Sequence, residues 1–337
     1  MIVAPGQGSQ KPGLLADWLK VAGAFEAMSA QSEASGLDLV ELGTAASQAA
    51  ITDTAHAQPL LVALGLLAGR ALQGPEPAAP ALAPADVYAG HSVGELTVAG
   101  LAGILDPVAA VALAARRGRE MAAAAALTPT GLSAVVGGAA EAVEAAITTA
   151  GLQAANYNGA GQIVAGGPRD LLAGLPAHLP PRSRALPLAV AGAFHTRFMA
   201  PALPGWAAAI DGVEPRDPAG IVLSNLDGAA ATSGADFLAR LIVQVTHAVR
   251  WDRCQATLRR LGVTGLLELP PAKTLTNIAK RDLKGVELFS LNTPDQLDAA
   301  RAFCARHAGP RLATPVASAA DPDGTPTPGA PTQEAPS

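Results

Sequence analysis

The sequence of 337 residues predicts an α/β fold in which a parallel-sheet core carries an inserted β-α-β-β-α-β unit. Two observations predict the core. Short apolar runs at residues 2–4 and 87–89 each end at a glycine-containing turn, and helical spacing follows the second turn directly. A third observation predicts the insert: beyond Thr128, short strand patterns alternate with helical ones. Half of the residues are hydrophobic, which excludes disorder for most of the chain.

The core elements alternate as an α/β fold requires. The run at 87–89 is typical of a buried strand, and residues 95–103 after it have helical spacing. Asp106-Pro107 predicts the start of a helix that runs to about residue 124, because Asp caps free N–H groups and Pro fits the first helical position. An Ala/Pro-rich surface loop is expected at 74–84. The other predicted core elements are helices near 14–25, 58–72, 196–210 and 235–244, and strands near 220–224 and 265–269.

The inserted unit is predicted to be ferredoxin-like from its order of elements. Its expected strands are 132–136, 153–156, 162–165 and 185–190, and its expected helices are 139–150 and a short one near 169–178. This divides the chain into a large catalytic subdomain of residues 1–126 and 191–308 and a small subdomain of residues 127–190. Residues 309–337 are rich in Pro and Ala and are expected to form a disordered tail.

Charge and cysteine content narrow the classes of partner and compartment. With 23 basic and 28 acidic residues and no basic run, the chain is not expected to bind nucleic acid or an anionic membrane. No secretory signal starts the chain, and no uninterrupted apolar run of about 20 residues is visible. The two cysteines, Cys254 and Cys304, form neither a metal cluster nor a disulfide framework, which favours a reducing, cytoplasmic compartment.

A candidate nucleophile stands between the strand at 87–89 and the following helix. Gly90-His91-Ser92-Val93-Gly94 has the Gly-x-Ser-x-Gly pattern of a nucleophile elbow, which predicts an α/β-hydrolase-like core. The glycines suit a strained turn in which side chains two residues from the serine would collide. Serine needs a base within hydrogen-bond reach, and the helix start offers N–H groups to an oxyanion. Alternatively, the pentapeptide only connects a strand to a helix.

Of the six histidines, His195 is the best candidate for the base. It follows a predicted apolar strand and precedes a predicted helix, and strand ends at one sheet edge are where sites assemble. A purely structural His195 remains an alternative. His91 is expected to pack or to stabilise the turn, because adjacent side chains leave a turn in different directions. A surface position is expected for the other four, His56, His178, His247 and His307.

Five ordered motifs between about residues 2 and 297 resemble those of the malonyl-CoA:acyl-carrier-protein transacylase family, which includes the acyltransferase domains of fatty-acid and polyketide synthases. They are Gly6-Gln7-Gly8-Ser9-Gln10, Gly90 to Glu95, Arg117-Gly118, Gly192 to Met199, and Gln244 with Val249-Arg250-Trp251. Ala248 stands where the family has proline, Pro270-Pro271-Ala272 replaces its usual Gly-Pro-Gly turn, the loop at 74–84 is swollen, and the insert's second helix is short.

The resemblance implies a role for each matched residue. Ser92 is the nucleophile and His195 the general base and then acid, while backbone N–H groups of Gln7 and Val93 form the oxyanion hole. The main-chain carbonyl of Gln244 orients His195 in place of the usual Asp, because a carbonyl can also fix which ring nitrogen carries the proton.

Substrate choice is implied by two further matches. Arg117 binds the free carboxylate of a malonyl group through two parallel hydrogen bonds, whereas Arg116 and Arg119 are expected to be solvated. Phe194 fills the space that an α-methyl group would need, which favours malonyl over methylmalonyl; a core aromatic is the alternative.

The expected reaction moves a malonyl group from malonyl-CoA to the phosphopantetheine thiol of an acyl carrier protein, with no metal or other cofactor. An acidic carrier would meet basic rim residues such as Arg169, Arg182, Arg184, Arg197 or Arg281. Two other functions stay open. A serine hydrolase or thioesterase would need an acid between Ser92 and His195, where Asp106 and Asp170 are the only aspartates. A non-catalytic carrier-binding subunit would not need Ser92.

Overall fold

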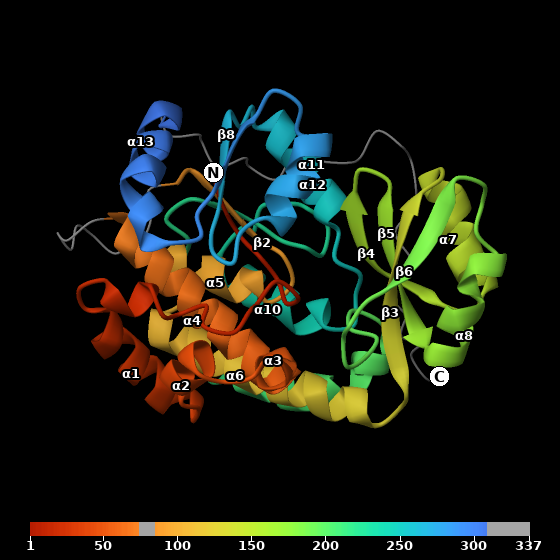
Figure 1. The fold of residues 1–337 in the computed structure, drawn as a ribbon, viewed down its shortest axis with the longest axis horizontal. Coiled ribbons are helices and arrows are strands. Elements are labelled where there is room, and N and C mark those ends of the chain that lie inside the picture. Colours follow the sequence, from red (N-terminus) through yellow and green to blue (C-terminus); the bar gives the residue numbers. More distant parts are fainter. Residues whose placement is uncertain (74–84, 309–337) are drawn as a thin grey trace, which may run out of the picture.

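The computed structural model describes residues 1–73 and 85–308, and it contains two sheets (Figure 1). The predicted loop at 74–84 and the predicted disordered tail at 309–337 lie outside the described residues. The larger sheet has the order β7-β2-β1-β8-β9, and every pairing in it is parallel. This confirms the predicted α/β fold with a parallel sheet. Its strands are β1 (Ile2–Ala4), β2 (Val87–Gly90), β7 (Ile221–Leu223), β8 (Gly265–Glu268) and β9 (Glu287–Ser290).

Helices surround this sheet and bury most of its side chains. Among them, α4 (Thr54–Gln73), α5 (Gly94–Leu101) and α6 (Pro107–Ala126) pack on one another. The predicted cap of α6 is present, since Asp106 accepts from the Val108 N–H at 2.8 Å. The remaining helices of the large unit are α1 (Ala24–Ser35), α2 (Leu39–Thr44), α3 (Gln48–Thr52), α9 (Leu203–Asp211), α10 (Gly234–Gln244), α11 (Trp251–Arg260), α12 (Thr274–Asp282) and α13 (Leu297–His307).

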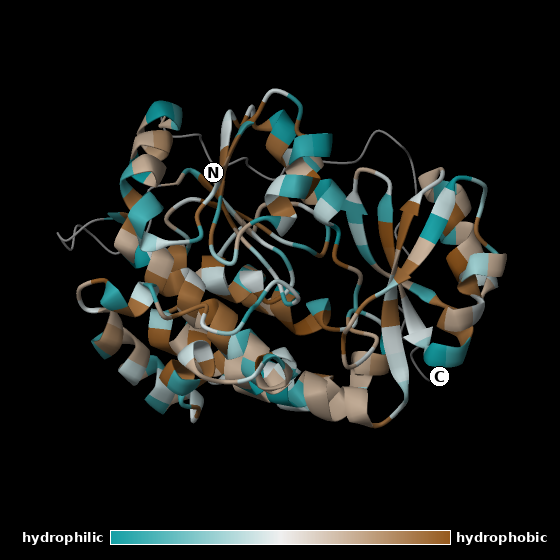
Figure 2. Ribbon diagram, in the orientation of Figure 1, coloured by the Kyte–Doolittle hydropathy of each residue, from teal (hydrophilic) through white to brown (hydrophobic). Residues whose placement is uncertain are grey.

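Helix α4 is long and apolar enough to meet a simple criterion for a membrane span, but 78 % of its apolar window is buried inside the protein. Figure 2 shows its apolar stretches in the middle of the large unit. Burial of this kind is typical of a core helix, which is hydrophobic on nearly every face because helices surround it.

Two predicted helices of the large unit are wrong in detail. Residues 14–25 form turns and a short 3₁₀ helix, Trp18–Lys20, and α1 begins only at Ala24, because Gly23 adopts a positive φ angle that interrupts a helix. The predicted helix at 196–210 is divided into a 3₁₀ helix, Arg197–Ala202, and α9. Proline at the start of α9 has no N–H to continue the preceding turn.

The smaller sheet has the order β4-β5-β3-β6 with antiparallel pairing throughout. Its strands are β3 (Thr130–Gly137), β4 (Gln153–Gly159), β5 (Gln162–Pro168) and β6 (Ser183–Pro187), and its helices are α7 (Ala140–Thr149) and α8 (Arg169–Gly174). The predicted β-α-β-β-α-β order of elements is therefore present, beside the large unit in Figure 1.

The strand predicted at 185–190 ends early. β6 stops at Pro187, and the Val190 N–H donates to the Leu188 carbonyl in a tight turn instead of continuing the ladder. Backbone hydrogen bonds at Val249 join the large unit to the small sheet. The Val249 N–H donates to the Ala155 carbonyl and the Val249 carbonyl accepts from the Tyr157 N–H, each at 2.9 Å. Thus β4 at the edge of the small sheet is tied to a loop of the large unit.

Candidate active site

Ser92 lies in a strained turn between β2 and α5. Its φ is 54°, in the left-handed region that few non-glycine residues adopt. A Cβ at Gly90 would overlap the backbone of Gly94 and Glu95, and one at Gly94 would overlap the Ala4 carbonyl of β1. The predicted reason for both glycines, close approach of strand and helix, is therefore correct. Strain of this kind is stored where it exposes a functional side chain.

The turn is held by Asn225, which the sequence analysis missed. Asn225 follows β7, is fully buried, and accepts from the Ser92 N–H through Oδ1 at 2.7 Å. Its Nδ2 donates to the Gly90 carbonyl, also at 2.7 Å. One side chain thus pairs two backbone groups of the elbow. Its position directly after a predicted strand was the only available signal in the sequence.

We expect Asn225→Ala to lower the free energy of unfolding by about 2–4 kcal/mol, because it leaves a buried N–H and a buried carbonyl of the elbow without partners. Urea denaturation of the wild type and the variant measures this loss. Asn225→Asp keeps an acceptor for the Ser92 N–H but turns a carboxylate oxygen toward the Gly90 carbonyl and buries a charge, so it should lose at least as much. A wild-type midpoint for Asn225→Ala would show that the two pairings contribute nothing.

His195 lies within hydrogen-bond reach of Ser92. Its Nε2 lies 2.7 Å from Ser92 Oγ, and its Nδ1 lies 2.9 Å from the main-chain carbonyl of Gln244. A carbonyl only accepts, so Nδ1 carries the proton and the Nε2 lone pair faces the hydroxyl. Burial, followed by the Arg117 charge, lowers the pKa of His195 to about 3. The imidazole is therefore neutral near pH 7.

The predicted setting of His195 is correct in part, because the residue follows β6 and precedes a 3₁₀ helix, Arg197–Ala202. It lies in the loop after β6, which is an edge strand of the small antiparallel sheet and not a strand of the parallel sheet. The loop is fixed instead by Thr130 Oγ1, which accepts from the Ala193 N–H at 3.0 Å, and His195 itself has a φ of 61°. Backbone anchoring of the loop, not a strand end, positions the ring.

Arg117 is buried on α6 and lies beside the serine. Its Nη1 donates to Gln58 Oε1 and its Nη2 to Gln244 Oε1, both at 2.7 Å, while Nη2 is 3.4 Å from Ser92 Oγ. Within residues 1–73 and 85–308, Nε has no hydrogen-bond partner. Burial lowers the pKa of Arg117 to about 10, and nearby Glu95 opposes that shift, so the group stays cationic. The Nε and Nη2 edge can thus donate two parallel hydrogen bonds to a carboxylate.

The neighbouring arginines on α6 are exposed, as predicted. Arg116 forms an ion pair with Glu120 at 2.9 Å, and Arg119 donates to the Ser35 carbonyl at 3.3 Å. Gln58, which the sequence analysis did not single out, fixes Arg117 from α4. No sequence signal distinguished it from the other polar residues of that helix.

Gln244 links every part of the site. Its carbonyl faces His195, its Oε1 accepts from Arg117, and its Nε2 donates to the Ser92 carbonyl at 3.1 Å and to the Glu95 carboxylate. Burial raises the pKa of Glu95 to about 8. Glu95 was noted only as the last letter of a motif, and the structure adds it to the site.

The proposed oxyanion donors and Phe194 occupy distinct surroundings. Gln7 lies in the loop after β1, and Val93 is the N-cap of α5. Among the described residues, neither main-chain N–H donates to a protein acceptor. Phe194 is 6 % exposed and belongs to the main hydrophobic core cluster. This packing fits the core alternative, and no contact in the structure tests its predicted selectivity.

The remaining histidines lie apart from the Ser92 hydroxyl. His91 Nε2 lies 3.0 Å from Asn158 Oδ1, and its ring packs 5.7 Å from that of Trp251, which fits the predicted turn-stabilising role.

Neither predicted candidate acid contacts His195, because Asp106 caps α6 and Asp170 is exposed on α8. No group of His, Cys, Asp or Glu suited to a metal ion occurs in the described part of the chain.

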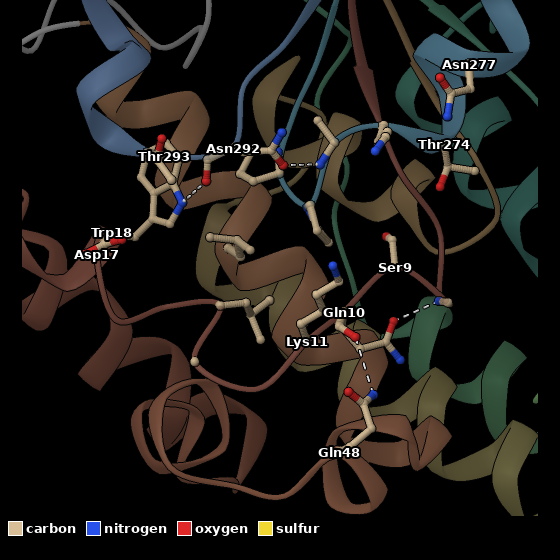
Figure 3. A pocket seen from close by; sticks show the side chains of 18 residues that line it. Ser9, Gln10, Lys11, Asp17, Trp18, Gln48, Thr274, Asn277, Asn292 and Thr293 are labelled. Atoms are coloured by element: carbon tan, nitrogen blue, oxygen red, sulfur yellow. Dashed lines mark hydrogen bonds between the residues drawn. The ribbon is translucent and has the colours of Figure 1, made fainter.

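The turn at Pro270-Pro271-Ala272, which replaces the family's Gly-Pro-Gly turn, lines a cavity of about 590 Å³ (Figure 3). Figure 3 shows Ser9 and Lys11 on one side of it and Thr274 and Asn277 on the other. Its lining does not include Ser92, His195 or Arg117. The departure therefore leaves the contacts among these three residues untouched.

The five arginines predicted to meet a carrier are all exposed. Arg169 lines a largely apolar cavity of about 920 Å³ between α3 and the small sheet, and Arg197 lines one of about 560 Å³ beside Tyr157. Arg182 and Arg184 lie at or next to β6, and Arg281 lies on α12 of the large unit. Their docking role stays a prediction.

Known proteins match nearly the whole described chain. The family model for an acyl transferase domain matches residues 1–301. The malonyl CoA-acyl carrier protein transacylase of Mycobacterium tuberculosis is 49 % identical over 298 residues, which cover 88 % of this chain and 97 % of that protein. The Escherichia coli K12 protein of the same name is 30 % identical over 305 residues, which cover 88 % and 97 %.

Solved structures agree in fold. The crystal structure of MCAT from Mycobacterium tuberculosis has a TM-score of 0.85 at 48 % identity and covers 89 % of this chain and 98 % of that one. A malonyl-transacylase solved in complex with a type II PKS acyl-carrier protein has a TM-score of 0.82 at 28 % identity, with coverage of 89 % and 98 %. The chain belongs to the malonyl-CoA:acyl-carrier-protein transacylase family.

Proposed function

We propose that this protein transfers a malonyl group from malonyl-CoA to the phosphopantetheine thiol of an acyl carrier protein, in two steps through a malonyl ester of Ser92. The observation that carries this proposal is the position of Ser92 Oγ, 2.7 Å from His195 Nε2 and 3.4 Å from Arg117 Nη2. A nucleophile, a neutral base and a cation for a free carboxylate thus meet at one point. Family membership supports the same activity.

In the first step, His195 Nε2 takes the proton of the Ser92 hydroxyl as Oγ attacks the thioester carbonyl carbon. The oxygen becomes an oxyanion that the N–H groups of Gln7 and Val93 stabilise. The carbon–sulfur bond then breaks, and coenzyme A leaves as a thiol with the proton from His195. The Gln244 carbonyl holds Nδ1–H throughout, so that Nε2 alone exchanges protons.

The second step reverses the roles. The phosphopantetheine thiol gives its proton to His195, and its sulfur attacks the carbonyl carbon of the malonyl ester. The carbon–oxygen bond breaks, and Ser92 recovers its proton from His195. These two reaction steps require no metal or redox group, so we propose that the enzyme uses no cofactor.

Arg117 selects the acyl group by binding the malonyl carboxylate through its Nε and Nη2 edge. Gln58 and Gln244 support this role because they hold the guanidinium in one plane. Phe194 excludes an α-methyl branch in the same proposal.

The finer architecture is also part of the proposal. The elbow after β2 supports an α/β-hydrolase-like core, and the strand order β4-β5-β3-β6 with its two helices supports a ferredoxin-like insert. The subdomains are then residues 1–126 with 191–308, and 127–190. Cys254 and Cys304 are both free thiols, which supports a reducing, cytoplasmic location.

Acyl-enzyme formation tests the function against its alternatives. Brief exposure to malonyl-CoA should add one malonyl mass to the intact protein, which persists until an acyl carrier protein or another thiol is added. Rapid release of free malonate would instead indicate a thioesterase. Absence of any adduct in a folded sample would indicate the non-catalytic subunit.

We expect kcat/KM for malonyl transfer to stay level from about pH 7 down to about pH 5. This ratio reports the free enzyme, in which burial lowers the pKa of His195 to about 3 and keeps the base form at all these pH values. Activity is lost only as the pH falls through the lowered pKa of His195. A steady-state pH profile, corrected for carrier unfolding, measures this loss on the acidic side. A fall centred near 6.5 would show an ordinary, solvated histidine.

A further inference from the structure

Glu95 is a fully buried carboxyl group that takes no part in the steps above. It lies in the first turn of α5, and its oxygens accept from two different parts of the site. Oε1 accepts from the Asn225 N–H at 2.6 Å, and Oε2 accepts from Gln244 Nε2. Asn225 holds the Ser92 N–H, and Gln244 contacts Arg117. Glu95 therefore connects the elbow with the group that faces the substrate carboxylate.

The contacts of Gln244 have a fixed polarity. Its side-chain amide lies between the Glu95 carboxyl group, which only accepts once it is ionised above its raised pKa, and the Arg117 guanidinium, which can only donate. The NH₂ group must then face Glu95 and the Ser92 carbonyl, and Oε1 must face Nη2. A reversed amide would place its NH₂ against the guanidinium, where donors meet donors. The carboxyl group thus sets which end of Gln244 Arg117 meets.

We infer that Glu95 is a positioning residue for acyl selectivity: by orienting the Gln244 amide, it holds the Arg117 guanidinium where it meets the free carboxylate of the substrate. The inference rests on the proposed function, because only a substrate with a free carboxylate uses Arg117. Acetyl-CoA lacks that carboxylate and serves as the internal reference.

Glu95→Gln tests this orientation with little change of shape. Glutamine has one acceptor oxygen, which the fixed Asn225 N–H occupies, so its NH₂ faces Gln244 and turns that amide around. Rapid-quench mass spectrometry above pH 8, where Glu95 is ionised, measures the rate of acyl-enzyme formation from malonyl-CoA and from acetyl-CoA. We expect malonyl loading to fall by about tenfold or more and acetyl loading by less than about threefold, because one charge-assisted contact is disrupted.

Glu268→Gln is the matched control. Glu268 is also a fully buried glutamate, at the end of β8, but its oxygens accept from backbone N–H groups of Lys273, Leu275 and Thr276 at the start of α12. This variant should lower the unfolding temperature without changing the ratio of malonyl to acetyl loading. It separates lost stability from lost orientation.

Glu95→Asp completes the test, since it keeps two acceptor oxygens on a shorter side chain. We expect its malonyl-to-acetyl ratio to lie between those of the wild type and Glu95→Gln. If Glu95→Gln does not fold, a ratio for Glu95→Asp below that of the wild type supports the inference. An unchanged ratio in the folded variants overturns it and leaves Glu95 with a structural role only. Failure of the wild type to form malonyl-enzyme overturns the proposed function instead.

Discussion

Ser92→Ala should abolish the malonyl-enzyme adduct and lower malonyl transfer on the order of 10⁴-fold or more. The reason is geometric, because Oγ is the atom that His195 Nε2 and Arg117 Nη2 both approach. Intact mass after exposure to malonyl-CoA measures the adduct, and transfer to an acyl carrier protein measures the activity.

The variant should keep the fold of the elbow. The hydrogen bonds from Asn225 to the Ser92 N–H and the Gly90 carbonyl involve backbone atoms of the turn and survive loss of the hydroxyl. Urea denaturation should therefore give nearly the wild-type midpoint. A folded Ser92→Ala protein that still carried one malonyl group would show that another residue is the nucleophile.

Arg117→Lys should lower malonyl loading by about 30- to 1,000-fold and leave acetyl loading nearly unchanged. This range corresponds to about 2–4 kcal/mol for a buried, bidentate pair with a carboxylate. Lysine keeps the charge but offers a single point donor, so it cannot present the Nε and Nη2 edge or pair with Gln58 and Gln244 together.

Arg116→Lys on the same helix is the control for this prediction. Arg116 is exposed and its ion pair with Glu120 is solvated, so the substitution should change neither acyl group's loading rate. Both rates come from single-turnover mass spectrometry with malonyl-CoA and acetyl-CoA. Equal losses for the two acyl groups in Arg117→Lys would assign the arginine to structure and not to selectivity.

Local pattern predicted the parts of the fold that local physics determines. The strand at 87–89, the glycine turn and the cap at Asp106 depend on residues close in sequence, and each is present. The helix predicted at 14–25 failed because its apolar spacing is used by a turn that the Trp18 indole ties to the Asn292 carbonyl. A partner 274 residues away cannot be inferred from spacing.

The residues of the site also fall into two groups, those that motifs predicted and those that only the fold reveals. The motifs pointed to Ser92, His195 and Arg117, whose side chains the fold brings together. Asn225 and Gln58 escaped notice because their roles exist only through contacts made between distant elements. His195 does stand between a strand and a helix, but that strand is an edge strand of the small antiparallel sheet and not of the parallel sheet.

The hydrogen bonds at Val249 attach the small sheet to the large unit close, along the chain, to the carbonyl that orients the imidazole. Val249 is clamped by the Ala155 carbonyl and the Tyr157 N–H, and it lies five residues after Gln244, whose carbonyl steers the imidazole. Any displacement of β4 away from the large unit therefore breaks these two hydrogen bonds first. Hydrogen–deuterium exchange at the Tyr157 and Val249 amides would register their loss.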